Sequence, residues 1–297
     1  MRTLRYSSIA LAAALSLTLT ACGSDDGGGS DVANPPAEET DFEAGTRMAE
    51  LAEAGKIRVG TKFDQPLFGQ KGLSGEPEGF DVEIAKIIAA ELGISGDNIE
   101  FVEAVSANRE PFLQQNRVDM VVATYTINDK RDMVVDFAGP YFEAGQDILV
   151  AAGNPKQVTG PDDLKKVKVC SVSGSTPAAT VQEKYGVTTA GLTLFDTYTK
   201  CRDALANGQV DAVTTDNVIL AGYASEAPDK FELIGEPFTQ EPYGVGIPEG
   251  QEEFCDFINE SLKKAEEAGT YAEAFEKTAG TVIEKTPTLP APRGCDN

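Results

Sequence analysis

"LQQNRVDMVVAT", residues 113–124, has a counterpart later in the chain in "LANGQVDAVTTD", residues 205–216. In both stretches a helical pattern ends at Asn-Arg or Asn-Gly, and a strand-like run rich in β-branched residues follows the shared Asp. The fifth residue after that Asp is Thr124 in the first copy and Asp216 in the second. We therefore expect Thr124 and Asp216 at the C-terminal ends of equivalent strands.

The similarity extends upstream of these two stretches. A strand, a helix and a second strand are predicted at 56–62, 80–93 and 98–106, and again at 166–176, 177–186 and 192–199, with a helix after each second strand. The chain thus contains two predicted βαβαβ units, at about 50–147 and about 160–235. This order predicts an α/β fold with two similar lobes, each a β-sheet flanked by helices.

The strand ends carry the candidate ligand contacts. In open α/β sheets, ligands bind outside the carboxyl ends of the strands, and two facing lobes would bring both sets of ends to one cleft. The residues at these ends are Lys62, Ser106, Thr124 to Thr126, Ser173 to Thr176 and Asp216.

The composition excludes several classes of function. The 297 residues suit two domains better than one, and the formal net charge is −23, from 25 Lys+Arg and 48 Asp+Glu. So acidic a protein should repel nucleic acid and anionic lipid, and any cation near the cleft is therefore informative. The chain has no histidine, which removes Ser-His-Asp and Cys-His catalysis and the commonest metal ligand. We expect no metal, no cofactor and no nucleic-acid partner.

The N-terminus has the pattern of a targeting segment. "MRTLR" is basic, and the apolar stretch 6–20, about 15 residues long, is too short to span a bilayer. It ends in Leu-Thr-Ala-Cys, which resembles the bacterial lipobox, so residues 1–21 are expected to be a lipoprotein signal peptide. Cys22 would then carry the lipid, with palmitate among its acyl groups; an ordinary secretory signal with a chance Cys is the alternative. Residues 22–45, rich in Gly, Pro and acids, are expected to form a disordered tether after that Cys.

Four cysteines remain after Cys22, and an even number in an exported protein suggests two disulfides. Three pairings are possible. We favour Cys170–Cys201 and Cys255–Cys295, because each pair then stays within one predicted lobe. No C-x-x-C occurs, so a zinc site is not expected.

"SVSGSTPAA", residues 171–179, can bind an anion. Gly174 permits a tight loop, Thr176 is a good N-cap, and Pro177 suits the first helical position. The helix start then offers free backbone N–H groups and a positive dipole end. The alternative is a capped helix without a ligand.

Arg131 and Asp216 form a predicted grip on a zwitterion. The Arg131 fork can hold a carboxylate through two parallel hydrogen bonds, and Thr124 and Thr126 can add hydroxyls. Asp216 can accept from an ammonium. The alternatives are a surface Arg131 paired with an acid of its own turn, and an Asp216 that only caps a turn or helix. Together these residues match an α-amino acid.

Two more cations, Lys62 and Arg109, lie near predicted strand ends and suggest a ligand with an anionic side chain. The alternative is pairing with neighbouring acids. Phe63 and Tyr125 are expected to pack on the methylene groups of the ligand, or else to be ordinary core.

The motifs of this sequence resemble those of a known family. The chain is similar to the solute-binding lipoproteins of polar amino-acid ABC importers, which are periplasmic-binding-protein-like proteins of family 3, in its lipobox and in "FDVEIAKIIAAELG", "NRVDMVVATYTINDKRDMVVDFAGPYF", "SVSGSTPA" and "NGQVDAVTTDNVIL". It looks most like the glutamate-binding proteins of actinobacterial importers in "GTKFDQP", "ATYTIN", "CSVSGSTPA" and "DAVTTD".

The resemblance implies a type II fold whose two lobes close over a ligand. Lobe 1 would comprise 46–147 and 241–297, and lobe 2 would comprise 148–240. Two chain crossings, near 147–150 and 240–244, would form a two-strand hinge.

The resemblance also implies a role for each site residue. The α-carboxylate would be bound by Thr124, Thr126 and Arg131 from lobe 1 and by Ser175 and Thr176 from lobe 2. The α-ammonium would be bound by Asp216, and a side-chain carboxylate by Lys62 and Arg109 with Ser106 nearby. Some glutamate and aspartate binders of this family have a histidine in lobe 2, which this chain lacks.

The function implied is ligand delivery without catalysis. A monomer on the extracytoplasmic face of the membrane would capture L-glutamate, or else aspartate, glutamine or asparagine, and pass it to ABC permease subunits. One rival is a small-acid dehydratase on the same scaffold, which needs a general acid such as Glu78 or Glu241. A second rival is an amino-acid sensor or adhesin.

Overall fold

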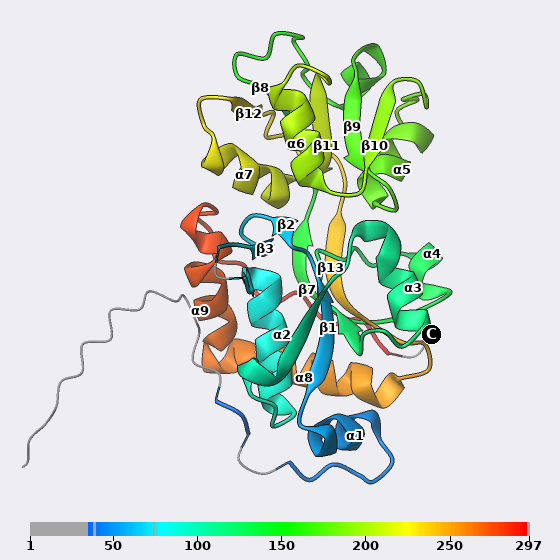
Figure 1. Ribbon diagram of the computed structural model, residues 1–297, viewed down its shortest axis with the longest axis vertical. Coiled ribbons are helices and arrows are strands. Elements are labelled where there is room, and N and C mark those ends of the chain that lie inside the picture. The colour runs from blue at the N-terminus through cyan, green and yellow to red at the C-terminus, as the bar shows by residue number, and fades with distance from the viewer. Residues whose placement is uncertain (1–34, 38–39, 74, 296–297) are drawn as a thin grey trace, which may run out of the picture. The chain divides into compact units, whose positions relative to one another are not determined.

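A computed structural model describes residues 35–37, 40–73 and 75–295. The predicted signal peptide, 1–21, and the predicted lipid-bearing Cys22 lie outside these residues. Two five-stranded sheets, each with helices beside it, make up most of the described chain (Figure 1). We call the first sheet with its helices the first lobe, and the second sheet with its helices the second lobe. Of the helices described, none has both the length and the apolar character needed to cross a membrane.

The first lobe is built on a sheet with the strand order β5-β1-β6-β13-β7. Its strands are β1 (Ile57–Thr61), β5 (Ile99–Glu103), β6 (Met120–Val121), β7 (Asp136–Ala144) and β13 (Glu241–Ile247). β1 pairs in parallel with β5 and β6, whereas β13 runs antiparallel to β6 and β7. Helices of this lobe are α2 (Phe80–Glu91), α3 (Arg109–Gln114) and α8 (Glu252–Ala268), of which α2 packs on β1 and α8 on β7.

The second lobe is built on a sheet with the strand order β10-β9-β11-β8-β12. Its strands are β8 (Gln146–Ala151), β9 (Val169–Val172), β10 (Leu192–Phe195), β11 (Ala212–Asp216) and β12 (Phe231–Leu233), and its helices are α5 (Thr176–Glu183), α6 (Tyr198–Ala206) and α7 (Asn217–Glu226). The order β10-β9-β11 repeats β5-β1-β6, and both triplets are parallel. The duplicated βαβαβ unit predicted from the sequence is therefore confirmed, and so is the α/β fold in two lobes.

The remaining elements are short or lie outside the two sheets. They are α1 (Arg47–Ala54), β2 (Asp64–Gln65), β3 (Gly69–Lys71), β4 (Pro77–Glu78), η1 (Gly96–Asn98), η2 (Ser106–Asn108), α4 (Asp129–Asp132), η3 (Pro161–Lys166), α9 (Thr270–Lys277) and η4 (Ala279–Thr281). β2, β3 and β4 form a small antiparallel sheet between β1 and α2 in the chain.

The chain passes between the two sheets twice. β7 ends at Ala144 and β8 begins at Gln146, so the first crossing is at Gly145. The return crossing lies between β12 and β13, at 234–240, whereas the sequence placed it near 240–244, where residues from 241 onward already belong to β13. The sequence placed the first crossing at 147–150, but those residues already pair with β11 as part of β8. An apolar strand that continues across a boundary gives no local signal of where it changes sheets.

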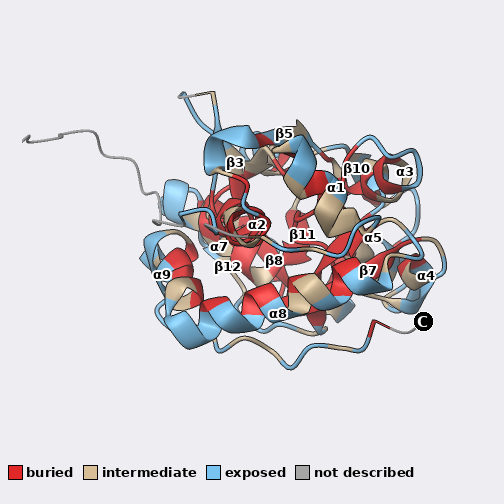
Figure 2. Ribbon diagram, turned by 90° about the horizontal axis from the view of Figure 1, so that it is seen from below, coloured by how far each residue is buried: buried red, intermediate tan, exposed pale blue. Residues whose placement is uncertain are grey.

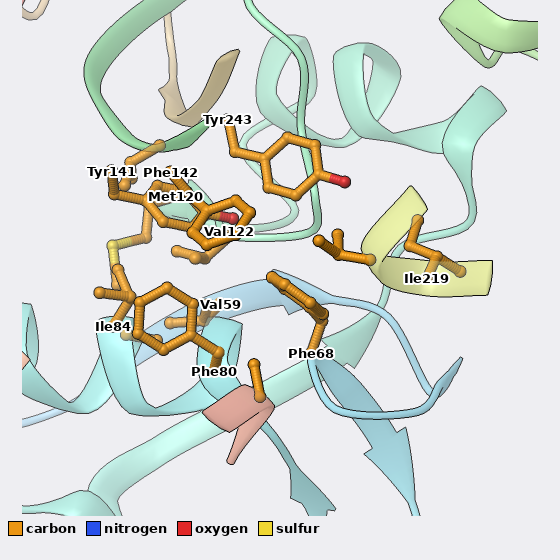
Figure 3. Close-up of a cluster of buried hydrophobic side chains, with 14 of the residues drawn as sticks. Val59, Phe68, Phe80, Ile84, Met120, Val122, Tyr141, Phe142, Ile219 and Tyr243 are labelled. Atoms are coloured by element: carbon orange, nitrogen blue, oxygen red, sulfur yellow. The ribbon is translucent and has the colours of Figure 1, made fainter. Parts of the chain in front are cut away.

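Burial explains the helical patterns. α2 is apolar on nearly every side and is buried along most of its length, because β1, α8 and α9 all pack against it (Figure 2). α8 is amphipathic and turns an exposed charged face outward. Below the crossings lies an aromatic cluster in which the ring centroid of Phe68 is 6.0 Å from those of both Phe80 and Tyr243 (Figure 3).

Both disulfides have the pairing that the sequence favoured. Cys170 is bonded to Cys201 within the second lobe, and Cys255 to Cys295 within the first.

The described end of the predicted tether makes contacts with the first lobe. Phe42 lies edge-on to Phe257 of α8 with ring centroids 5.5 Å apart, so packing against the first lobe begins before residue 46.

Candidate functional site

A buried cavity lies where the ends of the strands from both lobes meet. It holds about 210 Å³ of space not filled by protein atoms, and this volume includes open solvent at its mouth. Its lining comes from both lobes and consists of Gln65, Ser106, Arg109, Thr124, Thr126, Ser175, Thr176, Pro177, Tyr198, Thr215, Asp216 and Ile219.

Thr124 has an unusual backbone conformation at the floor of the cavity. Its φ is +44°, a region that β-branched residues rarely adopt. The carboxylate of Asp81, in the first turn of α2, accepts from the Thr124 N–H at 2.8 Å and from the Tyr141 hydroxyl at 2.6 Å. Burial raises the pKa of Asp81 to about 7, although both hydrogen bonds oppose that shift. Asp81 therefore holds the strained turn, and the Thr124 hydroxyl donates to Gln65 at 2.9 Å.

Arg109 and Arg131 lie over the same aromatic ring. Their guanidinium carbons are 4.3 and 4.8 Å from the ring centroid of Tyr125, which is fully buried and does not line the cavity. Tyr125 therefore supports the two cations from below, as a core residue. Arg109 also donates to the carbonyl oxygens of Ala123 and Thr124 at 3.0 and 3.2 Å. Burial, and then the charge of Arg131, lower the pKa of Arg109 to about 10, so it stays cationic at neutral pH.

Arg131 is buried and makes three hydrogen bonds. It donates to the Glu110 carboxylate at 3.0 Å, to the Thr126 carbonyl at 2.5 Å and to the Gly174 carbonyl of the second lobe at 3.1 Å. The alternative of a surface arginine paired with an acid of its own turn is wrong, because Asp132 pairs with Arg293 instead. Arg131 is not among the residues that line the cavity, but it lies directly behind Thr126, which does.

Lys62 is a third buried cation of the first lobe, beside Arg109 and Arg131. Its ammonium donates to the Ser106 hydroxyl at 2.8 Å. Burial, and then the nearby charge of Arg109, lower the pKa of Lys62 to about 7. Ser106 lines the cavity and Lys62 does not, so Lys62 lies one side chain away from the space.

Asp216 is the acidic group of the second lobe at the cavity. Its Oδ2 accepts from the Tyr243 hydroxyl at 2.6 Å, and its Oδ1 has no hydrogen-bond partner within the described residues. In Figure 3 the Tyr243 hydroxyl points toward the helix that carries Ile219, which begins directly after Asp216. Burial, and then the charge of Glu241, raise the pKa of Asp216 to about 7. Asp216 stands at the N-cap position of α7, but its side chain makes no capping bond to that helix, so the alternative of a carboxylate that only caps is wrong.

The helix start at residues 171–179 is capped one residue earlier than predicted. Ser175 is the N-cap of α5, and its hydroxyl accepts from the Ala178 N–H at 3.1 Å. Ser175 takes this place because it has the extended backbone of an N-cap, which leaves Thr176 and Pro177 as the first two helical residues. The Thr176 hydroxyl is therefore free to donate to Glu241 at 2.8 Å, next to the cavity.

The structure brings most of the predicted site residues to one place. Ser106, Arg109, Thr124, Thr126, Ser175, Thr176 and Asp216 line the cavity. Phe63 does not: it lies under the Lys71 ammonium, whose nitrogen is 4.9 Å from the ring centroid. Sequence reasoning missed Gln65, Tyr198 and Thr215, although each directly adjoins or follows a predicted strand end.

Comparison with known proteins places this geometry in a family. Residues 57–281 match the family model of bacterial extracellular solute-binding proteins, family 3. The ABC transporter glutamine-binding protein GlnH of Bacillus subtilis is 40% identical over 263 residues, which cover 88% of this chain and 92% of that protein. The glutamate-binding protein GluB of Corynebacterium glutamicum is 37% identical over 285 residues, which cover 91% of this chain and 90% of that protein.

A solved structure agrees with these relatives. That of an ancestral arginine-binding protein bound to glutamine has a TM-score of 0.70 and 37% identity, and the match covers 75% of this chain and 97% of that one. The neighbouring structures are type II periplasmic binding proteins, as the sequence predicted. This chain therefore belongs to the bacterial extracellular solute-binding proteins of family 3.

Proposed function

We propose that this protein captures an acidic amino acid, most simply L-glutamate, between its two lobes and delivers it to a membrane permease of an ABC importer. One observation carries the proposal. One small cavity is lined by Arg109 from the first lobe and by Asp216 from the second, whose Oδ1 atom has no hydrogen-bond partner in the part of the chain that the structure describes. The cationic Arg109 can bind a carboxylate of an amino acid, and the Asp216 carboxylate can bind its ammonium group.

The α-ammonium is proposed to bind Asp216. The free Oδ1 atom can accept from it, and the Tyr243 hydroxyl keeps the other carboxylate oxygen in place. Because burial has raised the pKa of Asp216, an incoming ammonium would restore its charged form.

The α-carboxylate is proposed to bind at Thr126 and Thr176, with Arg131 behind them. Two of the three hydrogen bonds of Arg131 go to neutral carbonyl oxygens. A carboxylate is a stronger acceptor for a guanidinium than a carbonyl is, so a ligand can compete for these donors. Thr124 and Ser175 supply further polar atoms at the same wall of the cavity.

The side chain of the ligand is proposed to meet Arg109 and the pair formed by Lys62 and Ser106. Lys62 and Arg109 are both buried, and a side-chain carboxylate is a stronger acceptor for their N–H groups than an amide is. Glutamine is the second candidate, because the relatives include a glutamine-binding protein as well as a glutamate-binding one.

Delivery and anchoring complete the proposal. Closure is favoured because a bound ligand contacts both lobes only when they are together. We propose that the protein acts as a monomer and is held at the extracytoplasmic face of the membrane by lipid on Cys22.

The dehydratase alternative depends on a general acid that faces the ligand. Glu78 is exposed and does not line the cavity. Glu241 is buried, but its two oxygens accept from Thr176 and Thr239, both at 2.8 Å. Recovery of chemically unchanged ligand from the purified protein supports binding alone, and turnover of a small carboxylic acid would support the alternative.

Thermal unfolding with and without ligand tests the proposal. At a glutamate concentration about a hundred times Kd, the stabilisation should be ~2.7 kcal/mol. Arg131→Ala should abolish the shift with every amino acid. Arg117→Ala is the matched control, because Arg117 also lies over an aromatic ring, 4.0 Å from the centroid of Phe112, but is exposed in the turn after α3. No shift with glutamate, aspartate, glutamine or asparagine would refute the assignment.

A further inference from the structure

α6 of the second lobe begins without a cap of its own. Its N-cap residue is Thr197, which has the extended backbone of a cap but makes no side-chain capping bond. The first backbone N–H groups of a helix need partners from outside the helix. Here the partner comes from the other lobe.

Asp64 supplies that missing cap. Its carboxylate Oδ2 accepts from the backbone N–H of Tyr198 at 2.8 Å and of Thr199 at 3.4 Å. Asp64 lies in β2, whose small sheet is held on the first lobe by Phe68, which packs against Phe80 and Phe142. A carboxylate at a helix N-terminus also interacts favourably with the helix dipole.

The backbone of Asp64 adds further contacts between the same elements. Its carbonyl oxygen accepts from the Thr199 hydroxyl at 3.2 Å and from the Tyr223 hydroxyl of α7. Next to it, α7 approaches so closely that a Cβ on Gly222 would lie 2.9 Å from the Cβ of Pro66. The segment around Asp64 therefore fits against the starts and sides of two helices of the second lobe.

We propose that Asp64 is an interlobe latch: a positioning residue that stabilises the closed arrangement and so sets affinity without touching the ligand. Asp64 does not line the cavity, but its chain neighbour Gln65 and its partner Tyr198 both do. When the lobes part, the carboxylate and the two N–H groups pass to water, so these bonds favour only the closed state. The inference rests on the proposed binding function.

The latch predicts an equal effect on every ligand. If only a fraction of the protein can adopt the closed state, the apparent affinity for a ligand is reduced in proportion to that fraction. Hydrogen bonds to a charged acceptor contribute enough that loss of this cap should weaken binding on the order of tenfold. Asp64 contacts no part of the ligand, but its charge raises the pKa of nearby Lys62, which is about 7. At pH 6, where Lys62 is charged, the factor should therefore be the same for glutamate, glutamine and any other amino acid that binds.

The test is calorimetry of the full folded chain with Asp64→Ala at pH 6, below the pKa of Lys62. The dissociation constants for glutamate and glutamine should both rise about tenfold. The control is Glu226→Ala, which removes two exposed bonds of Glu226, one to Gln70 at the same seam and one to Arg202 within the second lobe. It should change affinity less than about twofold. Unequal factors for the two ligands, or no change with Asp64→Ala, would overturn the proposal.

A second variant separates a latch from a simple helix cap. Thr197→Asp gives α6 a cap from its own lobe, so Asp64→Ala/Thr197→Asp should regain thermal stability without regaining affinity. Recovery of both would mean that Asp64 acts only on the helix, and the latch would be refuted.

Small-angle scattering separates failure of the latch from failure of the proposed function. If the wild-type protein binds none of the four amino acids, the proposed function fails by itself. The latch is then tested by the radius of gyration without ligand, which should be larger for Asp64→Ala than for the wild-type protein. An equal radius in that case would overturn it.

Discussion

The pH dependence of binding should distinguish an acidic ligand from its amide. Two groups beside the cavity have a pKa of about 7: Asp216, raised by burial, and Lys62, lowered by burial. Asp216 must be charged to hold the ammonium of any amino acid. Lys62 must be charged to favour a side-chain carboxylate, but an amide has no such need.

The sign follows from which form binds. A ligand ammonium favours the charged form of Asp216, so binding lowers its pKa and affinity falls as pH drops below 7. A ligand carboxylate favours the charged form of Lys62, so binding raises its pKa and glutamate affinity falls as pH rises above 7. Asp81 titrates in the same range, but its partners Thr124 and Tyr141 are present with or without ligand. We expect no change in its pKa on binding.

The magnitudes follow from those two pKa values. With one titrating acid, glutamine affinity should fall about tenfold from pH 8 to pH 6. With both groups, glutamate affinity should peak near pH 7 and be about threefold weaker at pH 6 and at pH 8. The ratio of the glutamate to the glutamine dissociation constant should therefore rise about tenfold from pH 6 to pH 8.

Calorimetry at three pH values, in buffers of different ionisation enthalpy, measures both the affinities and the protons exchanged. Lys62→Met should make the ratio independent of pH, and Asp216→Asn should remove the fall below pH 7 for both ligands. A constant ratio in the wild-type protein would refute the role of Lys62. A glutamine affinity that does not fall below pH 7 would refute the role of Asp216.

Three other predictions follow from contacts around the cavity and in the second lobe. Arg109→Leu should weaken glutamate more than glutamine by calorimetry; equal losses would mean that Arg109 does not read the side chain. Gly174→Ala should weaken all ligands, because its φ is +77° and a Cβ there would lie 2.7 Å from the Cα of Ala107 in the other lobe. Gly186→Ala, with φ +69° and nothing within 4 Å, should cost similar stability but leave affinity unchanged, and equal affinity loss in both would contradict the interlobe clash. The double variant Cys170→Ser/Cys201→Ser removes a disulfide between residues 31 positions apart, which increases the conformational entropy of the unfolded chain. The free energy of unfolding should fall by about 4 kcal/mol in denaturant titrations, and a loss under ~1 kcal/mol would contradict this entropic explanation.

Local sequence patterns were enough to predict the two-lobed α/β fold of this protein. The echo of 113–124 in 205–216 predicted equivalent strands, and β6 and β11 do take the same place in the two sheets. Such a prediction succeeds because hydrophobic periodicity and turn residues act within a few residues of the chain. The same patterns placed Ser106, Arg109 and Asp216 at strand ends, and those residues line the cavity.

Contacts between distant segments were decided only by the tertiary structure. No local rule indicates that Asp64 caps a helix that starts at Tyr198, or that Arg131 bonds to Glu110 and to the Gly174 carbonyl. The sequence by itself determined two duplicated lobes with polar strand ends. Which polar atoms were left free for a ligand depended on how closely the lobes approach, because donors such as the Thr176 and Tyr243 hydroxyls take acceptors that the other lobe brings within reach.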